Sequence, residues 1–186
     1  MNQQPTDTLQ QAIKQPAQSN DQLTVSIVSH GHGPQVATLV RQVLDDTSVT
    51  RLILTLNVSE TLELADDHRL LVIRNSVPKG FGANHNQAFS HCDTPYYCVL
   101  NPDVVLRPGA LSQLVECLRK SNAAVAGPLV LSGNGAQEDS WRRFPTVKNL
   151  FLKLIGRDSS TILRAQDEQQ QTQPDWVAGM CMLFRS

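Results

Sequence analysis

The chain has 186 residues, and its 16 lysines and arginines nearly balance 17 aspartates and glutamates, for a net charge of −1. This length suits one domain with a substantial core and is short for two. The balanced charge argues against non-specific nucleic-acid binding, which normally requires a basic excess. We therefore expect no nucleic-acid partner.

The cysteines and the first residues bear on the cellular compartment. Four cysteines are scattered along the chain with neither a CxxC pair nor zinc-finger spacing, and a reducing compartment is the simplest account of them. The first residues are polar and lack the apolar segment of a signal peptide. No uninterrupted apolar run approaches the length that crosses a bilayer. These features predict a cytoplasmic protein.

Composition also predicts the domain organisation. Residues 1–22 are rich in Gln, Pro, Thr and Asn and offer little to bury, which is typical of a disordered lead. The remaining residues, 23–186, are expected to form a single domain. Within that domain, residues 157–174 are polar and Gln-rich and predict a loop.

The first part of this domain alternates between strand and helix patterns. Residues 23–29 form a β-branched run that breaks at the glycines and proline of residues 30–34. Apolar residues then recur at helical spacing: Val36, Leu39, Val40, Val43 and Leu44. Two further apolar strands are predicted at residues 51–56 and 70–73. This order predicts an α/β, Rossmann-like fold with a mostly parallel central sheet.

A glycine-rich stretch, residues 77–89, follows the third strand. Gly80 and Gly82 would let the backbone approach a ligand closely, and a helix starting at Ala83 would present an amino end that favours anions. The spacing is not that of a dinucleotide-binding GxGxxG motif, and no acidic residue follows at the distance that motif requires. The alternative interpretation is an ordinary joint between a loop and a helix.

The stretch that most strongly suggests a site is Tyr96 to Asp103, in which an apolar strand stops abruptly at Asn101-Pro102-Asp103. Ligands of open α/β sheets bind at the carboxyl edge of the strands, where Asp103 would stand. One carboxylate can hold Mg²⁺ or Mn²⁺ when a substrate diphosphate supplies further oxygens. The alternative is that these residues form only a turn, in which Asn, Pro and Asp are common.

The last third of the domain predicts one more helix, with Leu111, Leu114, Val115 and Leu118 on one face, and strands at residues 123–131 and 175–184. Between the strands lie a basic and aromatic cluster, residues 140–146, and a short amphipathic helix, residues 147–155. We expect this helix to pack onto the sheet, with contact with a membrane face as the alternative. Arg142 and Arg143 suit phosphate binding, and equally suit a solvated basic patch.

Several polar residues have no partner visible in the sequence. His30 and His32 form an H-x-H pair without a third nearby ligand, so a loop role beside a ligand is expected rather than a metal site. His85 is interpreted as a surface or joint residue. Asp66, Asp67 and His68 are interpreted as a solvated turn.

Four stretches carry a resemblance to a known family: V-S-I-V-S-H at residues 25–30, the segment 75–86 with its K-G-F-G-A-N core, N-P-D at 101–103, and D-W-V-A-G-M at 175–180. In this order they resemble the family-2 glycosyltransferases, in particular the bacterial rhamnosyltransferase-like members that build surface polysaccharides. The S-W-R-R-F-P-T segment at 140–146 is also similar to one common in these relatives. The resemblance covers nearly all of the predicted domain.

The resemblance implies a domain of the glycosyltransferase A type that binds a dTDP- or UDP-sugar. It implies inverting sugar transfer to a saccharide or lipid-linked saccharide at the inner face of the cytoplasmic membrane, with peripheral membrane association. Asp103 matches the last carboxylate of the family's D-x-D site for Mg²⁺ or Mn²⁺, and Asn101 stands in place of its first acid. The other matched substrate-binding positions are Ser29, His30, Asn57, Glu60, Asn75, Gly80, Phe81, Gly82, Asn84, Trp176, Gly179 and Met180.

The sequence departs from the family's pattern after the W-V-A-G-M segment. The usual catalytic base lies in an acidic E-D-x-D stretch downstream, and residues 176–186 contain no acidic side chain. Asp175 is the nearest acid, so it is a candidate base, but the catalytic residue stays unassigned. We therefore expect a donor-binding domain that is C-terminally incomplete, as either a truncated or a naturally short form.

Two other function classes are weighed against active sugar transfer. A catalytically inactive sugar-nucleotide-binding or interaction module is favoured by the missing acidic stretch. A nucleotidyltransferase-like enzyme would also bind a nucleotide and Mg²⁺, but it should carry a basic residue in a glycine-rich loop directly after the first strand. Residues 29–33, S-H-G-H-G, contain no Lys or Arg.

Overall fold

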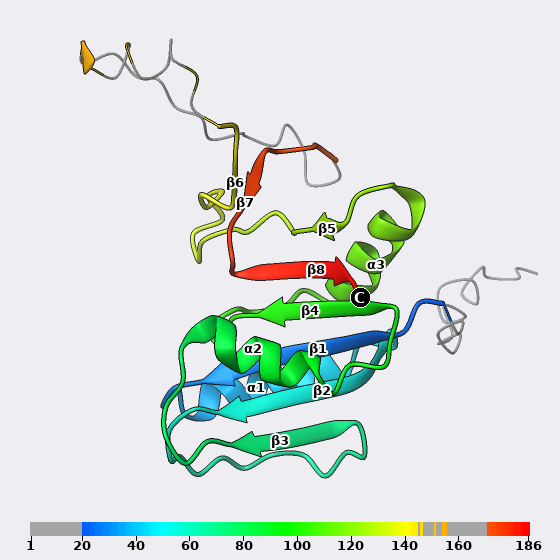
Figure 1. The fold of residues 1–186 in the computed structure, drawn as a ribbon, viewed down its shortest axis with the longest axis vertical. Helices are drawn as coiled ribbons and strands as arrows, with labels where there is room; N and C mark the ends of the chain where they lie inside the picture. Colours follow the sequence, from blue (N-terminus) through cyan, green and yellow to red (C-terminus); the bar gives the residue numbers. More distant parts are fainter. Residues whose placement is uncertain (1–19, 145, 147–150, 152–153, 156–170) are drawn as a thin grey trace, which may run out of the picture.

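The computed structural model describes residues 20–144, 146, 151, 154–155 and 171–186. Its main feature is a six-stranded sheet with the order β3-β2-β1-β4-β8-β5 (Figure 1). The strands are β1 (Leu23–Ser29), β2 (Val49–Leu56), β3 (Leu70–Arg74), β4 (Tyr96–Leu100), β5 (Val125–Ala126) and β8 (Cys181–Arg185). A separate two-stranded sheet pairs β6 (Trp141–Arg142) with β7 (Trp176–Val177).

Strand direction confirms the predicted α/β fold with a mostly parallel sheet. The pairs β1–β2, β1–β4 and β2–β3 are all parallel. Strand β8 runs antiparallel to both of its neighbours, β4 and β5. In Figure 1 the arrows of β2, β3 and β4 accordingly point to one side and that of β8 to the other. The carboxyl ends of the first four strands therefore share an edge with the beginning of β8.

Helices cover both faces of the sheet, which explains why its strands read as nearly continuous apolar runs. Helices α1 (Pro34–Leu44) and α3 (Ala110–Lys120) pack on one face, where their buried side chains join one core with alternate residues of β1. Helix α2 (Phe81–Phe89) lies against the other face, where His85 contacts Ser26 and Tyr97. The helical spacing of apolar residues correctly predicted the buried faces of α1 and α3.

The main core lies between the sheet and the α1–α3 layer. Side chains that point to this face are almost fully buried in β1, β2 and β4 alike, and two residues of β8 complete it. Full burial of one Val, Leu or Ile side chain stabilises the folded state by roughly 1.5–3 kcal/mol. The fully buried large side chains of this cluster are Leu23, Val25, Ile27, Val36, Leu39, Leu52, Leu54, Leu100, Leu111, Leu118 and Leu183.

Two predicted strands are wrong in extent. The strand expected at 123–131 is reduced to Val125–Ala126, because Gly127 and Pro128 follow and proline cannot donate to a sheet ladder. The strand expected at 175–184 is divided into β7 and β8 by a turn at Gly179 and Met180. Only the second part joins the main sheet. Helix α2 begins at Phe81, two positions before the expected Ala83.

The turn before β3 is also more structured than expected. Asp67 forms an ion pair with Arg69 at 2.7 Å, and the bonds from this guanidinium lower the pKa of Asp67 to about 2. The same guanidinium donates to the carbonyl oxygens of Leu44 (2.8 Å) and Val49 (3.1 Å). Arg69 therefore ties this turn to the end of α1 and the start of β2. Asp66 and His68 are exposed as expected, whereas Asp67 is half-buried and paired with Arg69.

The helix expected at 147–155 lies largely outside the described residues. At its three described positions, Phe151, Leu154 and Ile155, the side chains are exposed, and Leu154 reaches 84%. The expected packing onto the sheet is therefore not seen at these positions. Most of the predicted N-terminal lead, residues 1–19, also lies outside the described part. Among the described residues, no helix combines the length and apolarity needed to span a bilayer.

Candidate functional site

The candidate site follows the carboxyl edge of the parallel strands. Ser29 ends β1 opposite Leu56 of β2, and Ile27 lies opposite Leu100 of β4. The residues directly after these strands, His30, Asn57 and Asn101, therefore occupy one edge of the sheet. This is where ligands bind in open α/β sheets.

Asn57 is the centre of a hydrogen-bond network at this edge. Its side chain is 5% exposed, and its amide binds both backbone groups of Lys79. The Oδ1 atom accepts from the Lys79 N–H at 2.8 Å, and Nδ2 donates to the Lys79 carbonyl at 3.0 Å. Nδ2 also lies 2.9 Å from Nδ1 of His30. Because these groups occupy its amide, Asn57 holds the Lys79 segment in place rather than offering a free group to a ligand.

Asn75 and Asn84 extend this network. The Nδ2 atom of Asn75 donates to Oδ1 of Asn57 at 2.9 Å and to Oδ1 of Asn84 at 2.7 Å. Buried Asn84 in turn donates to the carbonyl oxygens of Lys79 (3.1 Å) and Gly80 (3.2 Å). Three asparagine side chains thus fix the backbone of Lys79 and Gly80. Lys79 itself, and Phe81 and Gly82 just beyond, stay exposed at the beginning of α2.

Glu60 organises the turn after β1. Its carboxylate accepts from the backbone N–H of Gly31 (3.3 Å) and Gly33 (3.2 Å), both of which have positive φ angles. His32 also serves this turn, because its Nδ1 accepts from the His30 N–H at 2.9 Å. This local use agrees with a loop role for the H-x-H pair. Within the described ranges, no three His, Cys, Asp or Glu side chains gather as a metal-binding group would.

Asn101 and Met180, both expected to bind substrate, contact each other at the end of β4. The Asn101 N–H donates to the Met180 carbonyl at 2.9 Å, so the turn between β7 and β8 lies beside the end of β4. Asp103 follows in an exposed turn, and nothing in the described part of the chain binds its carboxylate. A free, exposed carboxylate two positions after an asparagine suits Mg²⁺ or Mn²⁺ only if phosphate and water oxygens complete the shell.

Asp175, the candidate base, is engaged by its neighbours. Its Oδ2 accepts from the Phe144 N–H at 3.0 Å, and its Oδ1 lies 3.5 Å from a guanidinium nitrogen of Arg143. Trp176 follows, with its ring 5.9 Å from the Arg142 guanidinium in a cation–π contact. These contacts assemble the small β6–β7 sheet. Gly179 is exposed in the turn that follows it.

Sequence reasoning missed a buried polar group below α2. His85 is buried, its Nδ1 lies 2.8 Å from Ser26 Oγ, and its carbonyl accepts from the Tyr97 hydroxyl at 2.7 Å. Burial lowers the pKa of His85 to about 4, so the imidazole is neutral at pH 7. The surface interpretation of His85 is therefore wrong. The signal in the sequence was the helical spacing of Asn84, His85 and Ala88, the three residues that α2 buries.

Comparison with known proteins extends this description. Rhamnosyltransferase WbbL of Escherichia coli (strain K12) is 23% identical over 172 residues, which are 87% of this chain and 65% of that protein. The mannosyltransferase PcManGT from Pyrobaculum calidifontis, solved in complex with GDP-Man and Mn²⁺, is similar in fold. Its TM-score is 0.50 at 12% identity, over 60% of this chain and 36% of that one.

The chain thus spans less than two thirds of the length of both proteins. The model of glycosyl transferase family 2 matches residues 6–186, nearly the whole chain. The chain belongs to glycosyl transferase family 2.

Proposed function

We propose that this domain binds a nucleotide-diphospho-sugar, with dTDP or UDP as the nucleotide, and transfers the sugar with inversion. The observation that carries the proposal is the arrangement of one sheet edge. An asparagine-held segment with exposed Lys79 and Phe81 lies at one part of this edge, and the free carboxylate of Asp103 lies at another. Family membership and the similarity to WbbL support the same reaction.

The two parts of the edge suit the two ends of such a donor. In this proposal the base and ribose lie along Ser29, His30 and the segment from Lys79 to Gly82. The diphosphate lies near Asp103 and Asn101, the residues that would hold Mg²⁺ or Mn²⁺. A bound divalent ion would stabilise the negative charge that grows on the leaving diphosphate. The solved mannosyltransferase, in complex with GDP-Man and Mn²⁺, is consistent with this choice of ion.

In the proposed reaction an acceptor hydroxyl attacks the anomeric carbon while the bond to the diphosphate breaks. The acceptor proton must pass to a base, and a carboxylate suits this role. Asp175 is held by Arg143 and Phe144, so we do not assign it as that base. The acceptor in this proposal is a saccharide or a lipid-linked saccharide.

We further propose peripheral association with the inner face of the cytoplasmic membrane. Residues 140–157 contain five lysines or arginines and no acidic residue. Phe151, Leu154 and Ile155, at helical spacing within this segment, are exposed. Basic segments with exposed apolar side chains bind anionic lipid surfaces. A lipid-linked acceptor would lie in such a surface.

A calorimetric titration with dTDP and UDP, in Mn²⁺ and then in EDTA, tests donor binding. We expect one nucleotide to bind with Mn²⁺ and to bind at least tenfold more weakly in EDTA. Asp103→Ala should bring the Mn²⁺ titration to the EDTA level, whereas Asp66→Ala, an exposed carboxylate before β3, should leave it unchanged. Equal metal dependence in wild type and Asp103→Ala would contradict the site.

A second candidate function, an inactive sugar-nucleotide-binding module, is favoured by the engagement of Asp175 in the β6–β7 contacts. The two functions differ in turnover. Release of the nucleoside diphosphate from dTDP- or UDP-sugars, measured with and without a saccharide acceptor, separates them. Metal-dependent donor binding without acceptor-dependent release would favour the inactive module.

A further inference from the structure

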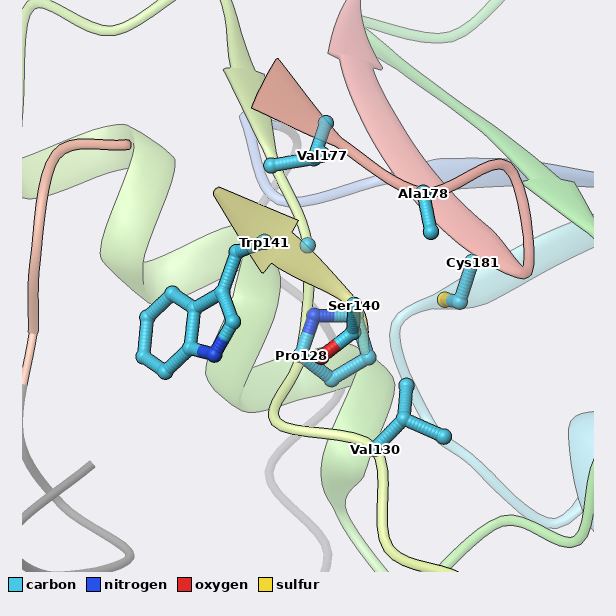
Figure 2. A pocket seen from close by; sticks show the side chains of 8 residues that line it. Pro128, Val130, Ser140, Trp141, Val177, Ala178 and Cys181 are labelled. Atoms are coloured by element: carbon cyan, nitrogen blue, oxygen red, sulfur yellow. The ribbon is translucent and has the colours of Figure 1, made fainter. Parts of the chain in front are cut away.

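A small hollow between the β6–β7 sheet and the beginning of β8 is too small for a substrate. Figure 2 shows it among Pro128, Val130, Trp141, Val177 and Cys181. Its volume is about 10 Å³, which is about the least that admits one water molecule. A nucleotide must therefore be recognised by exposed groups elsewhere, and the carboxyl edge of the parallel strands offers such groups.

The amide of Asn57, at this edge, has only one possible orientation. Its Oδ1 accepts from the Lys79 N–H at 2.8 Å, and a backbone N–H can only donate. Its Nδ2 donates one hydrogen to the Lys79 carbonyl at 3.0 Å, and a carbonyl can only accept. The second hydrogen of Nδ2 is left for Nδ1 of His30, 2.9 Å away. Asn57 is therefore a hydrogen-bond donor toward this imidazole.

The donor on Asn57 decides which nitrogen of His30 carries the proton. In a neutral imidazole one nitrogen donates a hydrogen bond and the other accepts one. Because Nδ1 accepts from Asn57, the hydrogen of the ring is on Nε2. His30 is exposed, and its Nε2 makes no hydrogen bond to the described part of the chain. The ring thus offers one N–H donor to a ligand at this edge.

The backbone around this donor is fixed. The Asn57 N–H donates to the Ser29 carbonyl at 2.8 Å, and the His30 N–H donates to Nδ1 of His32 at 2.9 Å. The same Asn57 nitrogen contacts the His30 ring and the Lys79 carbonyl. The imidazole therefore lies next to the Lys79 segment, along which the base of the donor lies in the proposed function. A donor that is already oriented loses little freedom when it binds.

We propose that the His30 Nε2–H donates a hydrogen bond to a carbonyl oxygen of the pyrimidine base, with Asn57 as the residue that positions this donor. The inference rests on the proposed function and adds to it a group that recognises the base. Uracil and thymine both carry two carbonyl oxygens, so UDP and dTDP can each accept this bond.

The position of the proton is tested without any ligand. Long-range ¹H–¹⁵N NMR spectra of the labelled protein at pH 7 distinguish the two neutral forms of a histidine ring. His30→Phe identifies the signals of His30 among those of the five histidines. We expect the form with the proton on Nε2.

Titrations of His30→Phe with UDP and dTDP in Mn²⁺ test the hydrogen bond to the nucleotide. Phenylalanine keeps an aromatic ring but has no N–H, so the affinity for both compounds should fall roughly five- to tenfold. His30→Gln places an amide nitrogen close to the position of Nε2 and should stay within about threefold of wild type. His91→Phe, at an exposed histidine after α2, is the control and should bind as wild type does.

Thio analogues of UDP show whether the bond goes to the base. Sulfur accepts hydrogen bonds more weakly than oxygen, so either 2-thio-UDP or 4-thio-UDP should bind wild type roughly threefold more weakly than UDP. His30→Phe should bind that analogue and UDP equally, because it has no donor to lose.

Four results would overturn the inference while wild type still binds UDP or dTDP. They are a proton on Nδ1 of His30, unchanged affinity in His30→Phe, and equal losses in His30→Phe and His30→Gln, which would make His30 a structural residue. The fourth is a loss in His30→Phe without any effect of the thio analogues, which would assign the donor to a phosphate oxygen. If wild type binds neither UDP nor dTDP, the proposed function fails and this inference fails with it.

Discussion

Asp46 and Ser112, 66 positions apart in the sequence, join the end of α1 to the first turn of α3. The Asp46 carboxylate accepts from the Ser112 backbone N–H at 3.2 Å and from the Ser112 hydroxyl. Helix α3 has Gly109 at its N-cap and no side-chain cap of its own. Asp46 therefore caps α3 from another element, with its negative charge at the favourable end of the helix dipole. It also accepts from the N–H and hydroxyl of Ser48.

Replacing Asp46 with Ala should destabilise the domain by roughly 1–3 kcal/mol, because the donors of buried Ser48 and half-buried Ser112 lose their acceptor. Chemical denaturation measures this change. The neighbouring Asp45→Ala is the matched control, since Asp45 is exposed and should change stability by less than about 0.5 kcal/mol. Equal effects of the two variants would contradict the capping role.

Removing the Asn57 side chain should release the Lys79 segment. Asn57→Ala loses the bonds to both backbone groups of Lys79, and we expect a loss of roughly 1–3 kcal/mol in stability. We also expect weaker dTDP or UDP binding, because the segment proposed to contact the base is no longer fixed. Calorimetry at a temperature where the variant stays folded measures binding. Exposed Asn122→Ala is the control. If Asn57→Ala is less stable but binds the nucleotide as tightly as wild type, the hydrogen-bond network of Asn57 does not position the nucleotide-binding segment.

His85 should make stability depend on pH in a defined window. Burial lowers its pKa to about 4 from the model-peptide value of 6.5, so between these values the unfolded chain takes up a proton that the folded protein does not. Stability therefore falls as pH falls from 6.5 to 4, by up to about 3 kcal/mol. Denaturation curves across this range measure the slope. His85→Gln should flatten it, whereas His68→Gln, with an exposed ring, should not. An unchanged slope in His85→Gln would assign the effect to other groups.

The proposed peripheral membrane association should depend on the exposed apolar residues within the basic segment, residues 140–157. The double variant Phe151→Ser and Leu154→Ser should reduce co-sedimentation with phosphatidylglycerol vesicles at least threefold, because it removes apolar surface that would enter the interface. Val105→Ser is the control, since Val105 is equally exposed elsewhere. Vesicles of phosphatidylcholine alone should bind all variants weakly. Binding that survives the double substitution would contradict this surface assignment.

The strands and helices around the site were largely predictable, because buried strands and amphipathic helices leave periodic apolar patterns. The apolar residues between Val36 and Leu44 recur at helical spacing, and the face that they form is the face of α1 that is buried in the structure. The end of β4 at Asn101 was equally clear from its Pro and Asp residues. Such signals are local, so they are visible in a linear sequence.

The relationships that shape the candidate site are not local. The family resemblance matches Asn57 to a position that lines the nucleoside pocket, and the structure adds that its amide binds Lys79, which lies 22 positions away. No sequence period indicates that pairing. The antiparallel placement of β8 was also invisible, because it depends on how distant segments meet after folding.

Strand β8 joins the sheet between two strands that precede it in the chain, so the gap between them is filled only after both have been made. It is inserted between β4 and β5, and Cys98 and Cys181, 83 positions apart, face each other there with their sulfur atoms 3.8 Å apart. Pairings between distant segments form slowly during folding. Until β8 docks, the open edge of β4 can pair with another chain and promote aggregation. During synthesis, the solubility of the nascent domain therefore depends on the arrival of β8.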